Sequence, residues 1–366
     1  MRLISTNYLQ ENMTLGKSIF NEKWQVLISE GVPLTKRMID RLIDLGITYV
    51  YIEDPQTDDI EIHEPISERS RREAIETIQE TFDIVKDERR LAKTFVFDRL
   101  AKKFSIVVRD ILSQVKSHKD VISLLADVCA YDNYIFTHSL NVTIYSLALG
   151  MELNLSYRQL EELGMGAMLH DVGKRVVPSE ILSKPGKLTN DEFDVIKKHA
   201  EDGFSLLRHV PNIPLTAAHC AYQHHERLDG SGYPRGLAGA DIHYYSRILA
   251  IADVYDAVTS NRVYRKAMLP QEGLEILYAG AGTKFEIHMV EAFRRAIAAY
   301  PVGLTVRLSD GRRGVVIRQN PGLSDRPVIR IFDHDGKIIE ATYELDLKDE
   351  LAVVIVETDT SLMSKK

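Results

Sequence analysis

Two histidine-rich segments place the strongest constraint on how this chain can fold. Residues 224–234 read HHERLDGSGYP, and residues 170–174 read HDVGK. Imidazole and carboxylate groups are poor filler for a hydrophobic core, and a Gly-Ser-Gly run weakens any helix or strand that contains it. The fold therefore needs another reason to accommodate these residues. Metal binding is the leading reason, because histidine and carboxylate side chains are common metal donors.

The composition indicates an ordinary globular chain. Its 366 residues are 45% apolar, which is enough for hydrophobic cores in two or three domains. A net charge of −7 argues against a nucleic-acid polymer as partner, since such proteins present a broad basic face. The first residues lack the apolar region of a signal peptide, and no run approaches the roughly 18 apolar residues of a membrane span. We therefore expect a cytoplasmic protein with no membrane partner.

The two cysteines, Cys129 and Cys220, belong to no CxxC or zinc-ribbon spacing. Both lie in contexts that look helical. We expect them to be buried and inert rather than a disulfide or a ligand pair.

The chain begins with a mixed stretch and a charged stretch. Residues 1–65 combine strand-like runs with a helix that should start after Thr35 and stop at Gly46, which predicts a small α+β module. Residues 66–118 are highly charged but carry an apolar stripe that includes Ile78. This pattern predicts a connector of long amphipathic helices, which join the modules or form a homodimer.

The remaining sequence predicts a helical domain followed by a β-rich one. Residues 119–300 contain successive helical patterns, and Thr189 with Glu192 predicts a capping box that places His199 about ten residues into a helix. Residues 301–358 alternate short strands with Asp-Gly turns, which predicts a small β-barrel or sandwich, and 359–366 should be a frayed tail. The fold class is therefore mainly α, with a small module at each end.

The candidate metal donors occur within the helical domain at positions where folding alone does not need them. They are His138, His170, Asp171, His199, His224, His225 and Asp253. Asp253 lies in the apolar run ILAIADVYDAV, where burying an unpaired carboxylate is costly unless it binds a cation, forms a salt bridge or caps a helix. Taken alone, His138 fits a core histidine and His199 a solvated helix face. Their joint occurrence favours a metal site.

The order of these motifs resembles the HD superfamily of metal-dependent phosphohydrolases. The segments HAEDG at 199–203, HHERLDGSGYPRGL at 224–237 and RILAIADVYDAVTSNRVYR at 247–265 resemble its HD-GYP branch, and the resemblance covers roughly residues 130–295. It implies a helical bundle that holds two or three metal ions, often iron or manganese, and hydrolyses the bacterial signalling molecule cyclic di-GMP. It also implies protein partners, including diguanylate cyclase domains, at the loop that contains Gly232, Tyr233 and Pro234 (the GYP loop).

The resemblance further implies a role for each motif residue. One metal site would consist of His138, His170, Asp171 and Asp253, and the other of His199, His224 and His225, with Asp171 bridging. Lys174 would contact the scissile phosphate or protonate the leaving group, and Arg262 and Arg265 would hold phosphate oxygens. Tyr233 would stack on a base or simply pack. A hydroxide between the two ions would attack phosphorus, which makes Asp171 and Lys174 the catalytic candidates.

Three departures from the family pattern qualify these expectations. Tyr134 stands where three-metal members have a glutamate, and Asp132 is badly spaced as a substitute, so we expect two divalent ions. Phe285-Glu286-Ile287 replaces the usual Phe-Asp-Pro, which predicts an altered contact beside the site. Arg265 occupies a position where lysine is frequent.

The residues leave the substrate and the fate of the ligand open. The leading hypothesis is a cyclic di-GMP phosphodiesterase that yields pGpG, GMP or both. Another cyclic dinucleotide such as cyclic GMP-AMP, or a simple nucleotide, is the second hypothesis. A third is a sensor or scaffold that binds a cyclic dinucleotide with little turnover.

Overall fold

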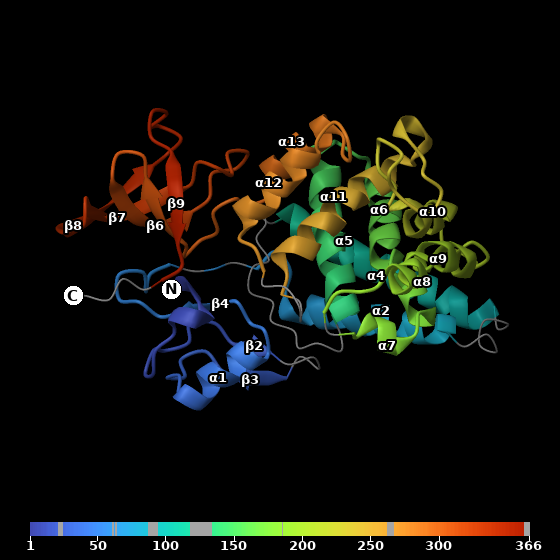
Figure 1. The fold of residues 1–366 in the computed structure, drawn as a ribbon, viewed down its shortest axis with the longest axis horizontal. Coiled ribbons are helices and arrows are strands. Elements are labelled where there is room, and N and C mark those ends of the chain that lie inside the picture. The colour runs from blue at the N-terminus through green and yellow to red at the C-terminus, as the bar shows by residue number, and fades with distance from the viewer. Residues whose placement is uncertain are drawn as a thin grey trace.

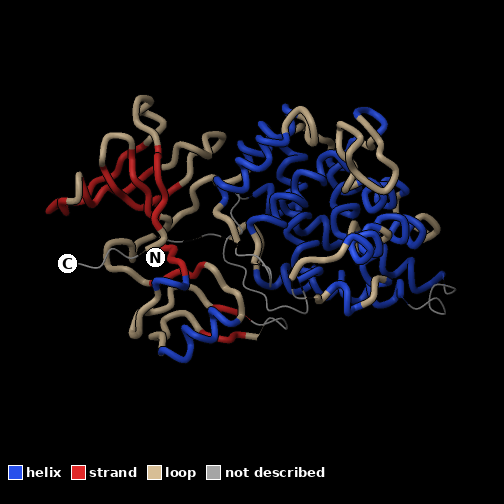
Figure 2. Tube along the Cα trace, viewed as in Figure 1, coloured by secondary structure: helices blue, strands red, loops and turns tan. Residues whose placement is uncertain are grey.

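The computed structural model consists of a helical bundle and two smaller modules. It describes residues 1–20, 25–60, 62, 64–86, 94–117, 134–184, 186–261 and 267–361. Figure 1 shows the bundle on one side, with the N-terminal module and the C-terminal β-sheet beside it. The strands lie in the two smaller modules, as Figure 2 shows. The predicted fold class, mainly helical with a small α+β module first and a β-rich module last, is confirmed.

The N-terminal module combines two short antiparallel strand pairs with one helix. Its elements are β1 (Arg2–Ser5), η1 (Thr6–Tyr8), β2 (Ile19–Phe20), β3 (Val26–Ile28), α1 (Lys36–Asp44) and β4 (Tyr49–Ile52). Strand β1 pairs with β4, and β2 pairs with β3. The hydroxyl of Thr35 caps α1 by accepting a hydrogen bond from the Met38 amide, and Gly46 follows the helix at φ +74°. The predicted start and stop of this helix are confirmed.

Two long helices follow the N-terminal module. They are α2 (Glu68–Lys86) and α4 (Thr94–Ser117), which pack on α5 (Tyr134–Glu152) and α6 (Tyr157–Leu169). Apolar side chains on their inner faces, including Ile78, Phe82 and Phe104, are buried in the same core as the rest of the bundle. The described side chains of the apolar stripe therefore stabilise this chain's own core and are not exposed to a second subunit.

Helix α5 occupies the centre of the bundle. Residues 136–150 are buried around the whole circumference of the helix, which agrees with a sequence that is apolar or small on every side. The elements that follow α6 are η3 (Val172–Val176), α7 (Ser179–Leu182), α8 (Asn190–Lys197), α9 (His199–Leu207), α10 (Leu215–Gln223), η4 (Gly239–Asp241), α11 (Tyr244–Thr259), α12 (Pro270–Gly280) and α13 (Ile287–Ala296). His138, on α5, is thereby placed deep inside the bundle.

The helix predicted after Thr189 is divided in two. Thr189 and Glu192 form the predicted capping box, but α8 ends at Lys197 and α9 begins at His199. The expectation that His199 lies about ten residues into one helix is therefore wrong. The reason is local, because the Nδ1 atom of His199 lies 2.6 Å from the Ile196 carbonyl oxygen and engages it at the break. The His199 ring is fully buried as a result.

The C-terminal module is one open antiparallel sheet. Its strands are β5 (Thr305–Leu308), β6 (Arg312–Arg318), β7 (Val328–His334), β8 (Lys337–Asp346) and β9 (Ile355–Asp359), in the spatial order β8-β7-β6-β5-β9. Positive φ values at Gly311, Asp335 and Gly336 confirm the two predicted Asp-Gly hairpin turns. The predicted sandwich is wrong, because a sandwich needs two sheets and these strands form one.

The N-terminal module packs against the C-terminal sheet. Leu3 and Tyr51 belong to the same hydrophobic cluster as Leu304 and Val306, so the N-terminal module covers apolar surface that a second sheet would otherwise cover. Arg2 strengthens this contact, since its Nη2 donates to the Thr305 hydroxyl at 2.7 Å. The two ends of the chain therefore form one packed unit.

The remaining predictions on chain class concern the cysteines and the membrane. Cys220 is a buried free thiol, and burial raises its pKa to about 12, which confirms that it is inert. Cys129 lies outside the described residues.

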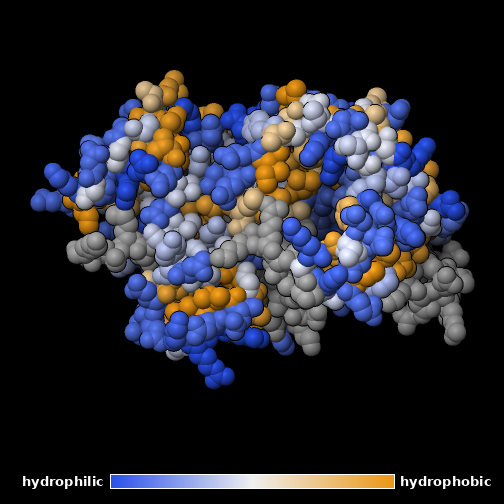
Figure 3. Space-filling model, viewed as in Figure 1, coloured by the Kyte–Doolittle hydropathy of each residue, from blue (hydrophilic) through white to orange (hydrophobic). Residues whose placement is uncertain are grey.

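None of the helices described is both long and apolar enough to span a bilayer. On the surface in Figure 3, apolar atoms are visible on the N-terminal module, where Val26, Leu27 and Ile43 are exposed.

Candidate metal centre

Six of the seven predicted donors lie in two groups. In each group, one potential ligand atom from every residue lies within 4.8 Å of the others. Group one consists of His138, His170 and Asp171, and group two consists of His199, His224 and His225. The structure therefore brings together the residues that the sequence proposed for the two sites.

The HDVGK segment enters the site at the end of α6. His170 is the C-cap of this helix and Asp171 precedes η3, so both side chains leave the helix together. A Cβ atom on Gly173 would lie 1.9 Å from the His199 carbonyl oxygen. Glycine at this position therefore allows the backbones of η3 and α9 to touch. This contact places Asp171 beside group two.

Asp171 lies between the two groups. Its Oδ2 atom is 3.3 Å from Nε2 of His170 and 3.6 Å from Nε2 of His138. Its Oδ1 atom is 3.5 Å from Nε2 of His199 and 3.9 Å from Nε2 of His224. Each oxygen thus faces one group, which is the arrangement that a carboxylate shared by two ions requires.

Asp253 on α11 provides a second carboxylate between the groups. Its Oδ1 atom is 3.1 Å from Nε2 of His138, and its Oδ2 atom is 3.7 Å from Nδ1 of His225. Its position inside an apolar run is therefore explained by the two histidines, rather than by a helix cap. The sequence assigned Asp253 to group one alone, whereas the structure also places it beside group two.

Asp256 is a buried residue of the site that the sequence interpretation missed. Its Oδ2 atom is 2.7 Å from Nδ1 of His138, and its Oδ1 atom accepts hydrogen bonds from Asn141 and Ser260. A carboxylate on one ring nitrogen fixes the orientation and tautomer of a histidine whose other nitrogen binds a metal. The signal was present in the sequence, because Asp253 and Asp256 are three residues apart in DVYD and share one face of a helix.

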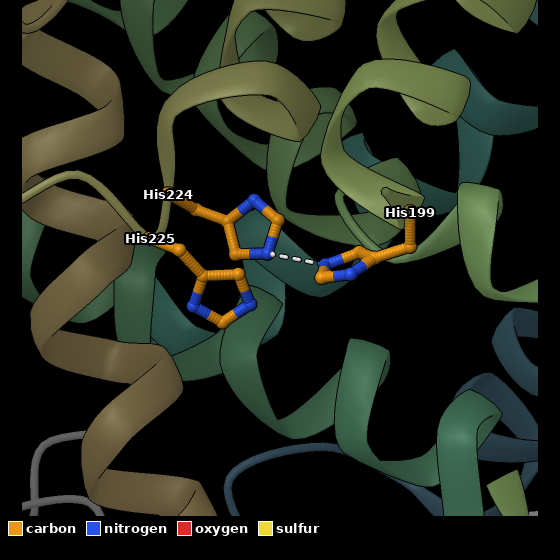
Figure 4. Close-up of side chains that lie close together, drawn as sticks. All are labelled: His199, His224 and His225. Atoms are coloured by element: carbon orange, nitrogen blue, oxygen red, sulfur yellow. Dashed lines mark hydrogen bonds between the residues drawn. The ribbon is translucent and has the colours of Figure 1, made fainter. Parts of the chain in front are cut away.

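Backbone carbonyls orient two histidines of group two, and also His170 of group one, whose Nδ1 lies 2.7 Å from the Ala167 carbonyl oxygen. Nδ1 of His199 lies 2.6 Å from the Ile196 carbonyl oxygen, and Nδ1 of His224 lies 3.0 Å from those of Cys220 and Ala221. If both Nδ1 atoms donate to these carbonyls, each neutral ring presents a lone pair at Nε2. These two Nε2 atoms lie 3.3 Å apart, as the dashed line in Figure 4 marks. Two facing lone pairs favour a cation between them.

The two groups differ in protonation. Burial lowers the pKa of His138, but hydrogen bonds with Asp253 and Asp256 outweigh burial and raise it to about 9. Burial lowers the pKa of His199 to about 4, and burial also holds the pKa of His224 and His225 well below the usual value. Group two is therefore neutral at physiological pH, as metal binding requires, whereas His138 must release a proton when a metal binds.

The two carboxylates stay ionised despite their burial. Burial raises the pKa of Asp171, but the charge of Lys174 and of the His170 ring more than offsets this and holds the pKa well below its usual value. Burial likewise opposes ionisation of Asp253, and the hydrogen bond from His138 lowers its pKa well below the usual value. Both carboxylates can therefore offer anionic oxygens to a metal ion.

Unsatisfied atoms provide an independent test of whether a metal fits here. Within the described part of the chain, Nε2 of His170 and Oδ1 of Asp171 are buried and have no hydrogen-bond partner. Leaving such atoms unpaired costs about 1–3 kcal/mol each. A cation at each group would satisfy them, and the imidazole and carboxylate donor set suits a divalent transition metal. The residues present therefore fit the implied metals.

The substrate-contact candidates are only partly described. Lys174 donates from Nζ to Oδ2 of Asp171 at 2.6 Å, and the Tyr233 ring stacks on the His225 ring with centroids 4.6 Å apart. Arg262, Arg265 and Asp132 lie outside the described residues, as does the side chain of Tyr134. The two residues that flank the stretch 262–266 can be placed. Asn261 accepts hydrogen bonds from Thr48, and the Thr48 hydroxyl accepts one from the amide of Ala267.

Glu226 is another residue that the motif reading left without a role. Its carboxylate is buried and accepts hydrogen bonds from the amides of Arg235 and Leu237 at 2.8 and 2.9 Å. A Cβ atom on Gly232 would lie 2.4 Å from the Cα atom of Glu226. Glutamate and glycine together therefore fold the GYP loop back onto the His-His segment, which holds Tyr233 beside His225.

The departure at Phe285-Glu286-Ile287 corresponds to a specific contact. Glu286 accepts a hydrogen bond from Arg247 at 2.7 Å, which links the start of α13 to the first turn of α11. Phe285 is buried, and the Arg227 guanidinium lies 5.4 Å from the centre of its ring. This contact is made by residues outside the two donor groups.

Comparison with known families agrees with this architecture. Residues 108–288 match the family described as the HD domain, and residues 305–362 match the KOW domain associated with the HD domain. The matched segment, which makes up most of the helical bundle, is thus an HD domain. The match begins inside α4, which agrees with the packing of that helix into the bundle core.

Several curated proteins are similar to this chain. A cyclic di-GMP phosphodiesterase of Pseudomonas aeruginosa is 36% identical over 62% of this chain and 55% of its own length. A cyclic di-GMP phosphodiesterase response regulator of Xanthomonas campestris is 44% identical over 40% of this chain and 39% of its own. A 3'3'-cGAMP-specific phosphodiesterase of Vibrio cholerae is 41% identical over 44% of this chain and 38% of its own. The matches span about half, or less, of these relatives.

Proposed function

We propose that this chain is a metal-dependent phosphodiesterase that hydrolyses cyclic di-GMP to pGpG, GMP or both. The observation that carries the proposal is Asp171, whose two oxygens face two separate groups of buried histidines. Similarity to several proteins named cyclic di-GMP phosphodiesterases supports the choice of substrate.

The donor groups define where the ions would bind. One ion would be held by His138, His170 and Asp253. The other ion would be held by His199, His224 and His225. Asp171 would contact both ions. The ions would be iron or manganese, because imidazole with carboxylate suits these metals and the donor set contains no thiolate among the described residues. Bound ions would neutralise charge on the phosphate and lower the pKa of a bound water.

The chain's own residues would position the phosphate and the leaving group. The Lys174 ammonium is 20% exposed at the edge of group one, where it can donate to a phosphate oxygen or protonate the departing ribose oxygen. Arg262 and Arg265 would hold phosphate oxygens through their planar guanidinium groups. Buried carbonyls and carboxylates hold the histidine rings in place, so little reorganisation is needed when the substrate binds.

The first experiment is turnover under anaerobic conditions. Protein loaded with iron or manganese would be incubated with cyclic di-GMP, the products separated by chromatography, and the metal content of the same sample measured. Formation of pGpG or GMP by protein that contains two ions per chain would support the proposal. Bound metal without hydrolysis would contradict it and favour a sensor or scaffold.

Cyclic GMP-AMP is the second candidate substrate. Similarity to a 3'3'-cGAMP-specific phosphodiesterase favours it, although that match spans 38% of the relative. Competition between equal concentrations of the two dinucleotides gives the ratio of kcat/KM directly. A ratio above one for cyclic di-GMP supports our assignment, and the reverse replaces it.

The two proposed protein partners need separate tests. The GYP loop, residues 230–237, remains the proposed contact for a diguanylate cyclase domain, and binding of such a domain should be lost when this loop is altered. A homodimer would need a surface other than the stripe on α2 and α4, which is buried. Light scattering at micromolar concentration measures the mass, and a monomer would exclude the dimer.

A further inference from the structure

A series of aromatic rings leads outward from group two. The Tyr233 ring stacks on His225, with centroids 4.6 Å apart and planes inclined by 29°, and also meets the edge of the His199 ring at 6.4 Å. Beyond it, the Phe193 ring meets Tyr233 nearly at right angles, with centroids 6.3 Å apart. Tyr233 therefore lies between the candidate metal ligands and Phe193.

The Phe193 ring is exposed to solvent, although it contacts the Tyr233 ring. It is 43% exposed and lies on α8, an eight-residue helix in which no residue is buried. The capping box of Thr189 and Glu192 and the ion pair of Glu192 with Lys184 stabilise this helix instead of a hydrophobic face. The helix therefore holds an apolar ring at the surface next to the proposed catalytic site.

Lys197 places a positive charge beside the same rings. Its Nζ atom lies 4.7 Å from the centre of the Phe193 ring and 6.0 Å from that of Tyr233, within the range of a cation–π contact. Its carboxylate partner is Asp194, whose side chain is 65% exposed, at 2.8 Å. An ion pair this exposed contributes little to stability. The Lys197 ammonium is therefore available to another acceptor.

We propose that Phe193 and Lys197 form a subsite for a guanine base of the substrate, which rests on the function proposed above. An exposed ring offers a face on which a base can stack, and aromatic stacking tolerates any base. Lys197 supplies the discrimination, because O6 and N7 of guanine are both acceptors, whereas adenine presents an amino group in place of O6. The subsite adds two residues of α8 to the candidate substrate contacts.

The test isolates the contribution of the base. GMP and ribose 5-phosphate share the phosphate and the sugar, so the ratio of their dissociation constants reports the base alone. We would titrate each into manganese-loaded protein by calorimetry. Phe193→Ala should weaken GMP binding about tenfold and leave ribose 5-phosphate unchanged, since stacking contributes roughly this much per base. Phe193→Trp should restore GMP binding, and Lys197→Met should reduce the preference for GMP over AMP.

A matched control and three outcomes decide the proposal. Tyr278→Ala removes a ring with the same 43% exposure from α12 and should change neither constant. The subsite is excluded if Phe193→Ala changes both constants equally, or neither. Cyclic di-GMP turnover that Phe193→Ala leaves unchanged would exclude the subsite while the proposed function stands. Loss of GMP preference in this variant, with no turnover by the wild type, would exclude the function and retain the subsite.

Discussion

The two donor groups differ in how one histidine is held. In group one, His138 is held by the carboxylate of Asp256, while His170 is held by the Ala167 carbonyl oxygen. In group two, His199 and His224 are held by backbone carbonyls. A side-chain brace can be removed by one substitution, whereas a carbonyl brace belongs to the helix itself. The comparison therefore predicts that group one is more easily disturbed through neighbouring residues.

The two groups also differ in charge. Group one contains Asp171 and is contacted by Asp253, while group two contains only imidazoles and shares both carboxylates from one side. Anionic oxygens attract a divalent ion more strongly than neutral rings. We expect the ion at group one to bind more tightly, and the ion at group two to depend on the shared carboxylates.

The largest effect should follow replacement of Asp171, which serves both groups. Asp171→Ala should abolish binding of both ions and all turnover, because each group loses the oxygen that faces it. Metal analysis and product chromatography measure the two losses. Asp241→Ala, at an exposed aspartate of η4, is the matched control and should retain both ions. Full metal content in Asp171→Ala would contradict the shared role.

A smaller effect is expected from His225, the donor of group two that is partly exposed. His225→Ala should remove one ion and leave the ion at group one, because Asp256 and the Ala167 carbonyl orient His138 and His170 there. Turnover should fall steeply, since both ions are needed. A metal titration would separate one retained ion from none, and loss of both would show that the groups are not independent.

Replacement of Asp256 tests the side-chain brace of group one. Asp256→Asn should lower the affinity for the ion at group one about 10–100-fold, which is typical of removing a carboxylate behind a metal-binding histidine. Binding at group two should not change. Competition with a chelator measures both affinities in one experiment. Equal weakening at the two groups would indicate a general loss of packing instead.

The smallest effect concerns the stability of the metal-free protein with pH. Folding lowers the pKa of His199 from 6.5 to about 4, so between these values the unfolded chain binds a proton that the folded chain does not. The free energy of unfolding should therefore fall as the pH drops through this window. Folding raises the pKa of His138 to about 9, and its contribution, complete below pH 6.5, should be lost as the pH rises through 9.

Urea unfolding of chelated protein measures these opposite slopes. Each histidine contributes roughly 3 kcal/mol at most to the free energy of unfolding. His199→Gln should flatten the acid side of the profile, and His138→Gln the alkaline side. Identical profiles in the two variants would show that the groups do not differ in protonation.

Much of the site could be read from the sequence because the chemistry of its residues is unusual. The joint occurrence of histidines and aspartates within one helical domain identified all seven candidate donors, and the structure brings six of them into two groups with Asp253 beside both. Asp256 was missed because a buried carboxylate one turn from another gives no sign of which histidine it contacts. Phe193 was missed because an exposed phenylalanine in a short helix is ordinary until its neighbours are known.

Local features of the fold were determined by the sequence alone. The cap at Thr35, the capping box at Thr189 and the Asp-Gly hairpins depend on hydrogen bonds and backbone angles within a few residues. The single C-terminal sheet and the burial of the α2 and α4 stripe did not follow from it. Only the tertiary structure decided these, because each depends on which distant surface covers an apolar face or meets a polar atom.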